Sequence, residues 1–120
     1  MSKKDQVWVV EEQLASSWTD GYTEDYAVIS IHRTKAGAEK CAENQRLDNA
    51  VYGLTDGEIG DHKTNPDTIL GKVGNAEVAE ALRQAASKPG AKFMDAILST
   101  IDKFEIEVAD VTVDSRNLED

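Results

Sequence analysis

With 120 residues, of which 40% are hydrophobic and 30% charged, the chain is expected to form one folded domain spanning residues 1–120. Its net charge of −10 argues against direct binding to nucleic acid, which requires a basic patch to neutralise phosphates, and against binding to an anionic membrane surface. No run of about 18 to 20 apolar residues is present to span a bilayer, so we expect a soluble, cytoplasmic protein.

The acidic residues gather near the two ends of the sequence. Residues 1–30 contain six acidic and two basic residues, and residues 101–120 contain seven acidic and two basic residues. The negative charge of the sequence therefore lies mainly at its two ends.

Two strands are predicted at the front of the chain. Residues 6–13 (QVWVVEEQ) are rich in β-branched and aromatic side chains and apolar on both faces, as in a central strand. Residues 26–32 (YAVISIH) alternate, with Ala27, Ile29 and Ile31 expected on one face. The polar segment between them, residues 15–25, contains an Asp-Gly turn and predicts an antiparallel hairpin.

A helix is predicted directly after the second strand, over residues 33–47, with Thr34 as its N-cap. Its inward stripe consists of small or polar side chains: Ala38, Cys41, Ala42 and Gln45. Residues 48–74 are rich in glycine and predict a long irregular, mobile loop with a short strand near residues 50–54. Loops of this length are uncommon unless they are functional or mobile, so this segment is a second candidate surface.

Two helices and a final strand complete the prediction. Residues 75–87, with an Asn75 cap, and residues 91–104 show helical spacing of apolar side chains. The strand is predicted over residues 104–114, with a β-bulge near Ala109 that restores its alternation. Residues 115–120 are expected to be a frayed tail.

The predicted fold is an α+β domain. It has a small, mainly antiparallel sheet of about three to four strands, with helices packed on one face. The expected element order is strand, strand, helix, loop or short strand, helix, helix, strand.

An acidic row is predicted on the last strand. With the bulge, Glu105, Glu107, Asp110 and Asp114 would all face outward. If this strand lies beside the first, Glu11 and Glu12 would join the same surface. Carboxylates on the outer face of a half-exposed antiparallel strand are ordinary, so a merely solvated face is the alternative to a partner-binding one.

Two aromatic residues, Trp18 and Tyr22, lie in the acidic segment before the second strand, where their neighbours include Asp20, Glu24 and Asp25. Such residues either fold back on the core or serve as interface anchors, because they bury a large rigid area at low entropic cost.

No motif in the sequence specifies a reaction. His32 and His62 have no zinc-ligand spacing, and the acidic segment 56–67 lacks the ligand pattern of an EF-hand. The single cysteine, Cys41, falls on a helix stripe expected to face the sheet, so we expect a buried structural residue. We therefore expect no cofactor, no metal and no enzymatic activity.

The sequence favours a noncatalytic protein-binding protein whose acidic surface docks onto the basic site of a nucleic-acid-handling protein, with carboxylates in place of phosphates. Inhibitors of restriction and CRISPR systems encoded by phages and mobile elements are similar in size and charge alone. Two alternatives stay open. The first is a self-associating structural or assembly protein, including a homodimer, and the second is a small-molecule-binding domain.

Overall fold

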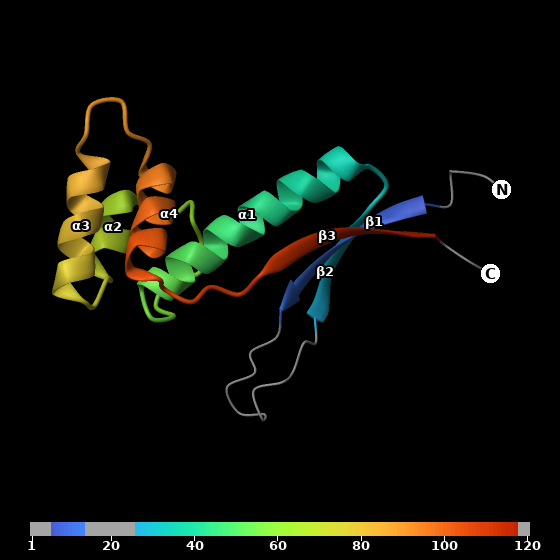
Figure 1. Ribbon diagram of the computed structural model, residues 1–120, viewed down its shortest axis with the longest axis horizontal. Helices are drawn as coiled ribbons and strands as arrows, with labels where there is room; N and C mark the ends of the chain where they lie inside the picture. The colour runs from blue at the N-terminus through green and yellow to red at the C-terminus, as the bar shows by residue number, and fades with distance from the viewer. Residues whose placement is uncertain (1–5, 14–25, 118–120) are drawn as a thin grey trace, which may run out of the picture. The chain divides into compact units, whose positions relative to one another are not determined.

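The computed structural model describes residues 6–13 and 26–117, and the chain divides into two compact units (Figure 1). The sheet unit comprises residues 1–46 and 109–120, and the helical unit comprises residues 47–108. The described residues form three strands and four helices, in the order β1 (Gln6–Gln13), β2 (Tyr26–His32), α1 (Lys35–Leu54), α2 (Pro66–Gly71), α3 (Ala76–Ala86), α4 (Phe93–Phe104) and β3 (Val111–Asn117). None of these described helices combines the length and hydropathy of a membrane-crossing segment.

The described strands form one antiparallel sheet with the order β2-β1-β3. β1 and β2 begin and end at the predicted residues and pair antiparallel. β3 pairs with the other edge of β1, where Val113 lies opposite Val10. The predicted α+β class is thus confirmed, and β1 is apolar on both faces because it is the central strand.

The first half of α1 covers one face of this sheet. Ala38 and Ala42 are fully buried against Val10 and Val111. They are four residues apart and so lie on one helical face, where their small side chains allow a close approach to the strands. The helix begins after Thr34, as predicted, and the Gly37 N–H donates to Thr34 Oγ1 at 3.0 Å.

Two polar side chains of α1 also join the helix to the sheet. Arg46 donates from Nη2 and Nε to the Val111 carbonyl oxygen, at 2.8 and 3.2 Å. Gln45 Nε2 donates to Glu12 Oε1 at 2.9 Å. These contacts stabilise α1 against β1 and against the start of β3.

The second half of α1 belongs to the helical unit. Its Ala50, Val51 and Leu54 are buried in a core completed by Ile69, Val73, Val78, Leu82, Ala96 and Ile97. The predicted loop and short strand are therefore wrong for residues 48–54, because these apolar positions form one buried helical stripe.

The predicted loop also contains α2. Asn65 caps this helix, with its Oδ1 accepting from the Asp67 N–H at 2.8 Å, and Pro66 suits the first turn because its missing N–H would have no helical partner. Residues 55–65 and 72–74 of the predicted loop do lie outside helices.

α3 and α4 confirm the two helices predicted at residues 75–87 and 91–104. Asn75 caps α3 as predicted, and its Oδ1 accepts from the N–H groups of Glu77 and Val78. The two helices pack against each other within the core of the helical unit.

The prediction for the last strand is wrong at its start. Phe104 is the final residue of α4, and Glu105 adopts a left-handed conformation with φ 51° and ψ 46°. The Ile106 N–H donates to the Ile101 carbonyl at 3.0 Å, as in a Schellman cap, so the chain turns here instead of extending.

Residues 106–110 then lead to β3 outside any strand, and the first contact with the sheet is made by the Asp110 carbonyl oxygen, which accepts from the Gln13 N–H of β1 at 2.8 Å. They pass close to α1 at Gly53, where an added Cβ would lie 3.3 Å from the Glu107 carbonyl oxygen. β3 begins only at Val111 and continues to Asn117. The bulge predicted near Ala109 is therefore not formed, and residues 115–117 belong to the strand instead of a frayed tail.

A buried hydroxyl fixes the turn after α1. Thr55 Oγ1 accepts the Ile59 N–H at 3.0 Å and lies 2.9 Å from the Val51 carbonyl oxygen and 3.2 Å from that of Ile59. A Thr hydroxyl donates one proton and accepts others, so this side chain satisfies backbone groups on both sides of the turn.

Replacing Thr55 with valine is expected to lower the free energy of unfolding by about 1–3 kcal/mol, because the Ile59 N–H loses its acceptor in a buried setting. Denaturant unfolding followed by circular dichroism measures the change. The control is Thr68→Val, at an exposed position of α2, where we expect about 0.5 kcal/mol or less. Equal losses in the two variants would contradict this role of Thr55.

Replacing Glu105 with glycine is expected to raise the free energy of unfolding by about 0.5–1 kcal/mol, because glycine adopts the left-handed conformation without strain. Glu107→Gly is the control, since Glu107 is equally exposed but has no positive φ and should gain nothing. A loss of stability in Glu105→Gly would show that the carboxylate itself stabilises this turn.

Candidate functional site

The acidic row predicted on the last strand is divided between two parts of the fold. Glu105 and Glu107 lie in the helical unit, before the sheet begins, whereas Asp114 lies on β3 in the sheet unit. Asp110 immediately precedes β3, and its carboxylate lies 3.4 Å from the Tyr26 hydroxyl, which donates to it. One continuous strand face of carboxylates is therefore not formed.

Glu11 and Glu12 do not extend such a row either. Arg116 Nη2 lies 3.0 Å from both carboxylate oxygens of Glu11, so this charge is paired across β1 and β3. Glu12 is the next residue along the strand, points to the opposite face, and accepts from Gln45. Both acidic groups are engaged within the sheet unit.

The candidate anchors in the hairpin segment lie outside the described residues. These are Trp18, Asp20, Tyr22, Glu24 and Asp25. Their part in binding a partner stays a prediction.

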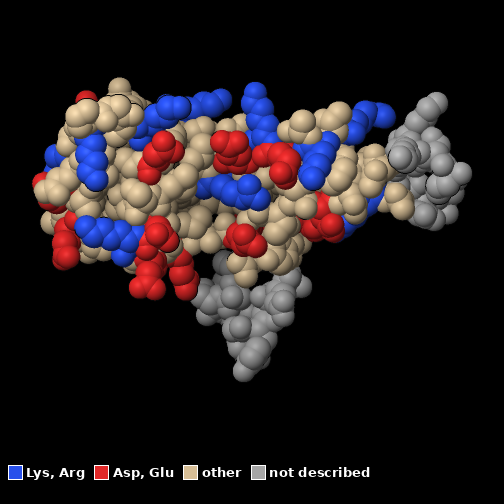
Figure 2. Space-filling model, turned by 45° about the horizontal axis from the view of Figure 1, so that its top comes forward, with Lys and Arg blue, Asp and Glu red and all other residues tan. Residues whose placement is uncertain are grey.

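The charge excess of the described residues lies mainly in the helical unit, which has eleven acidic and six basic residues. Eight of the acidic side chains are exposed and enter no ion pair with any described residue: Asp56, Asp61, Asp67, Glu77, Asp95, Asp102, Glu105 and Glu107. Figure 2 shows Asp and Glu at several places on the face in view, some of them next to one another and others with Lys and Arg between them. The carboxylates on that face do not merge into one continuous patch.

Strand β2 carries an exposed apolar strip, defined here as Val28, Ile29 and Ile31, which the sequence analysis did not identify. These residues are 50%, 40% and 62% exposed. The signal available in the sequence was that residues 26–32 include three large aliphatic side chains and no Asp, Glu, Lys or Arg.

A β-bulge sets the direction of these side chains. Ser30 lies opposite Val10, but the next residue of β1, Glu11, lies opposite Val28, so Ile29 has no direct partner. The predicted alternation through Ile29 and Ile31 is therefore wrong. Val28 and Ile31 instead share the face of the sheet turned away from α1.

Ser30 links two polar side chains on the α1 side of the sheet. Its Oγ lies 2.7 Å from His32 Nε2 and 3.1 Å from Cys41 Sγ, and Cys41 is half-buried beside the core. A hydroxyl beside an imidazole can act as a nucleophile when a third group orients the imidazole. No carboxylate among the described residues contacts His32, so this chain of contacts satisfies polar atoms without forming a triad.

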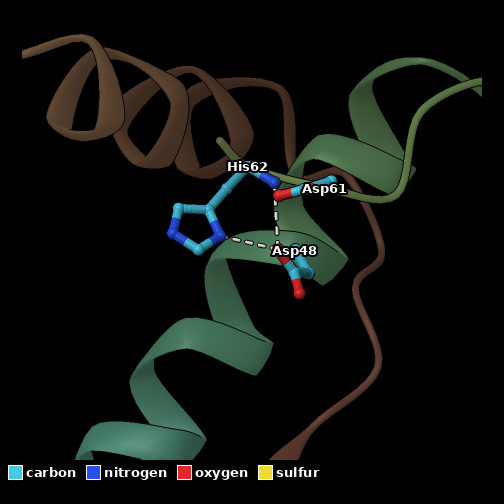
Figure 3. A group of neighbouring side chains, drawn as sticks. All are labelled: Asp48, Asp61 and His62. Atoms are coloured by element: carbon cyan, nitrogen blue, oxygen red, sulfur yellow. Dashed lines mark hydrogen bonds and ion pairs between the residues drawn. The ribbon is translucent and has the colours of Figure 1, made fainter. Parts of the chain in front are cut away.

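Asp48, Asp61 and His62 form a second polar cluster, within the helical unit (Figure 3). Asp48 lies on α1, and the other two lie in the loop that follows. Asp48 Oδ1 accepts from the His62 N–H at 2.9 Å and from the ring Nδ1 at 2.6 Å. A carboxylate only accepts, so the proton between them belongs to Nδ1.

This cluster brings one potential metal ligand from each residue to within 4.8 Å of the others. However, two ligands on one tetrahedral zinc, with bonds of about 2.0–2.2 Å, stand about 3.3 Å apart. The Nδ1 to Oδ1 distance of 2.6 Å is instead that of a strong hydrogen bond. Asp61 is exposed and accepts the Lys63 N–H at 2.8 Å. The arrangement is therefore a contact that holds the loop onto α1.

Replacing Asp48 with alanine is expected to lower the free energy of unfolding by about 1–3 kcal/mol, because the His62 N–H and ring N–H both lose their acceptor. Asp61→Ala is the matched control, with an expected loss of about 0.5 kcal/mol because this side chain is exposed. Thermal or denaturant unfolding measures both, and a larger loss in the control would overturn the assignment.

Comparison with family models, with curated proteins and with solved structures finds no match to the chain.

Proposed function

We propose that the chain is a noncatalytic protein-binding protein that acts in the cytoplasm, with acidic groups that occupy the basic site of a nucleic-acid-handling protein. An inhibitor, of the kind that phages and mobile elements direct against restriction or CRISPR systems, is the form of this function that agrees with its size and charge.

The observation that carries the proposal is the set of eight exposed carboxylates of the helical unit that enter no ion pair with described residues. Their charge is not neutralised within the described part of the chain. Opposite charges on a partner would increase the rate of encounter and favour one docking orientation.

Glu105 and Glu107 are two of these carboxylates that lie close together in the sequence. Both are exposed, whereas Ile106 and Val108 between and after them are half-buried. Asp102, in the last turn of α4, adds a third exposed carboxylate close in sequence. Substitution at these three positions removes no buried side chain.

A triple variant, Asp102→Lys, Glu105→Lys and Glu107→Lys, is expected to weaken binding to a basic partner by tenfold or more, on the order of 1.4 kcal/mol. The partner is first recovered on the immobilised chain from cell extract at low and at moderate salt, and identified by mass spectrometry. Its affinity for each variant is then measured by isothermal calorimetry.

The matched control reverses three exposed carboxylates of the sheet unit: Glu39→Lys, Glu43→Lys and Asp114→Lys. It changes the net charge equally, so it separates the position of the charges from their number. Binding should fall by less than about threefold in this control. Equal losses in both variants, or recovery of no basic protein at low salt, would contradict the proposal.

A further inference from the structure

Strand β2 is an edge of the sheet in the described part of the chain. One side of it pairs with β1, and no other described strand pairs with it. Edge strands are usually protected from pairing with a further chain by charged side chains, by proline or by their short length. β2 has seven residues and contains no Asp, Glu, Lys, Arg or Pro.

The opposite edge of the sheet differs in this respect. β3 carries Asp114 and Arg116, both exposed. Charges of this kind oppose the pairing of an edge strand with another strand. The two edges therefore differ in their capacity to accept a further strand, and β2 is the more receptive.

The apolar strip on β2 would lose exposed surface in such a pairing. Val28 is 50% and Ile31 62% exposed, and the bulge places them on the same face of the sheet. Cross-strand contacts between aliphatic side chains of this kind stabilise an antiparallel pair.

The charge of the chain indicates which strand pairs with β2. Two copies with a net charge of −10 repel each other wherever their carboxylates meet, but contact through β2 brings no charged side chains of the two strands together. An antiparallel pair of identical strands is also self-complementary about a twofold axis. We propose that two copies of the chain associate through β2, which forms one continuous sheet across the dimer.

The bulge selects the register of this pair. Residues directly opposite each other must point to the same face of a sheet. Placing Val28 of one copy opposite Ile31 of the other meets this condition and also brings Ala27 opposite His32. The Val28–Ile31 contact then occurs twice, once on each side of the twofold axis, and the two contacts flank a central pair formed by Ile29 and Ser30.

The association is tested by analytical ultracentrifugation of the full chain from about 1 µM to about 1 mM. The expected result is a concentration-dependent dimer. Val28→Lys and Ile31→Lys should each raise its dissociation constant at least about 100-fold, because they place uncompensated charges in an apolar contact. Leu98→Lys is the matched control: Leu98 is exposed on α4, 44% accessible, and its substitution should change the constant less than threefold.

Three results of the ultracentrifugation experiment would overturn the proposed dimer. A wild-type chain that stays monomeric at about 1 mM overturns the proposal. So does a dimer that survives either β2 substitution in a variant whose circular dichroism is unchanged, and so does an equal effect of Leu98→Lys. If β2 instead binds a different protein, the chain by itself would stay monomeric in this experiment.

Disulfide formation tests the register. Two variants are prepared, one with Val28→Cys and the other with Ile31→Cys, and each also carries Cys41→Ser. Glutathione disulfide is added to each variant by itself and to an equimolar mixture of the two. A disulfide-linked dimer should form several-fold faster in the mixture than in either sample alone, because opposite residues place their Cα atoms within disulfide range. Equal rates in all three samples would overturn the proposed register.

Discussion

Helix α1 is the element on which the rest of the structure depends, because it supplies side chains to two cores. Ala38 and Ala42 are buried against the sheet, and Val51 and Leu54 are buried against the other helices. Neither core is large, and each includes a stretch of this one helix. Loss of helical structure in α1 would therefore remove buried contacts from both units at once.

The sequence predicted those elements whose patterns have one physical interpretation. β1 and β2 were found to the residue because β-branched side chains bounded by polar segments favour strands, and α3 was found through the Asn75 cap. The continuation of α1 was missed because Gly53 favours a loop locally, while burial of Val51 and Leu54 favours a helix. The start of β3 was placed too early because Ile106 and Val108 alternate with acidic residues whether or not a strand partner is present.

Much less of the candidate site could be predicted. The sequence shows how many carboxylates there are, but not that Glu11 meets Arg116, which is 105 positions away. It likewise gave no reason to connect Asp48 with His62, because their contact depends on the turn that Thr55 holds. The shared face of Val28 and Ile31 could not be predicted, because it depends on a bulge at Ile29 that shifts the alternation of side chains by one residue. No residue type in the sequence marks that bulge.

The uncharged strand β2 belongs to one unit and the eight exposed carboxylates belong to the other, which has a consequence for the two proposed associations. Salt weakens attraction between carboxylates and a basic protein, and it also weakens the mutual repulsion of two acidic chains. Raising the ionic strength would thus release the basic partner and favour the pairing of two copies. The ionic strength of the solution would thus determine whether the chain binds a basic protein or a second copy of itself, without any change in its own fold.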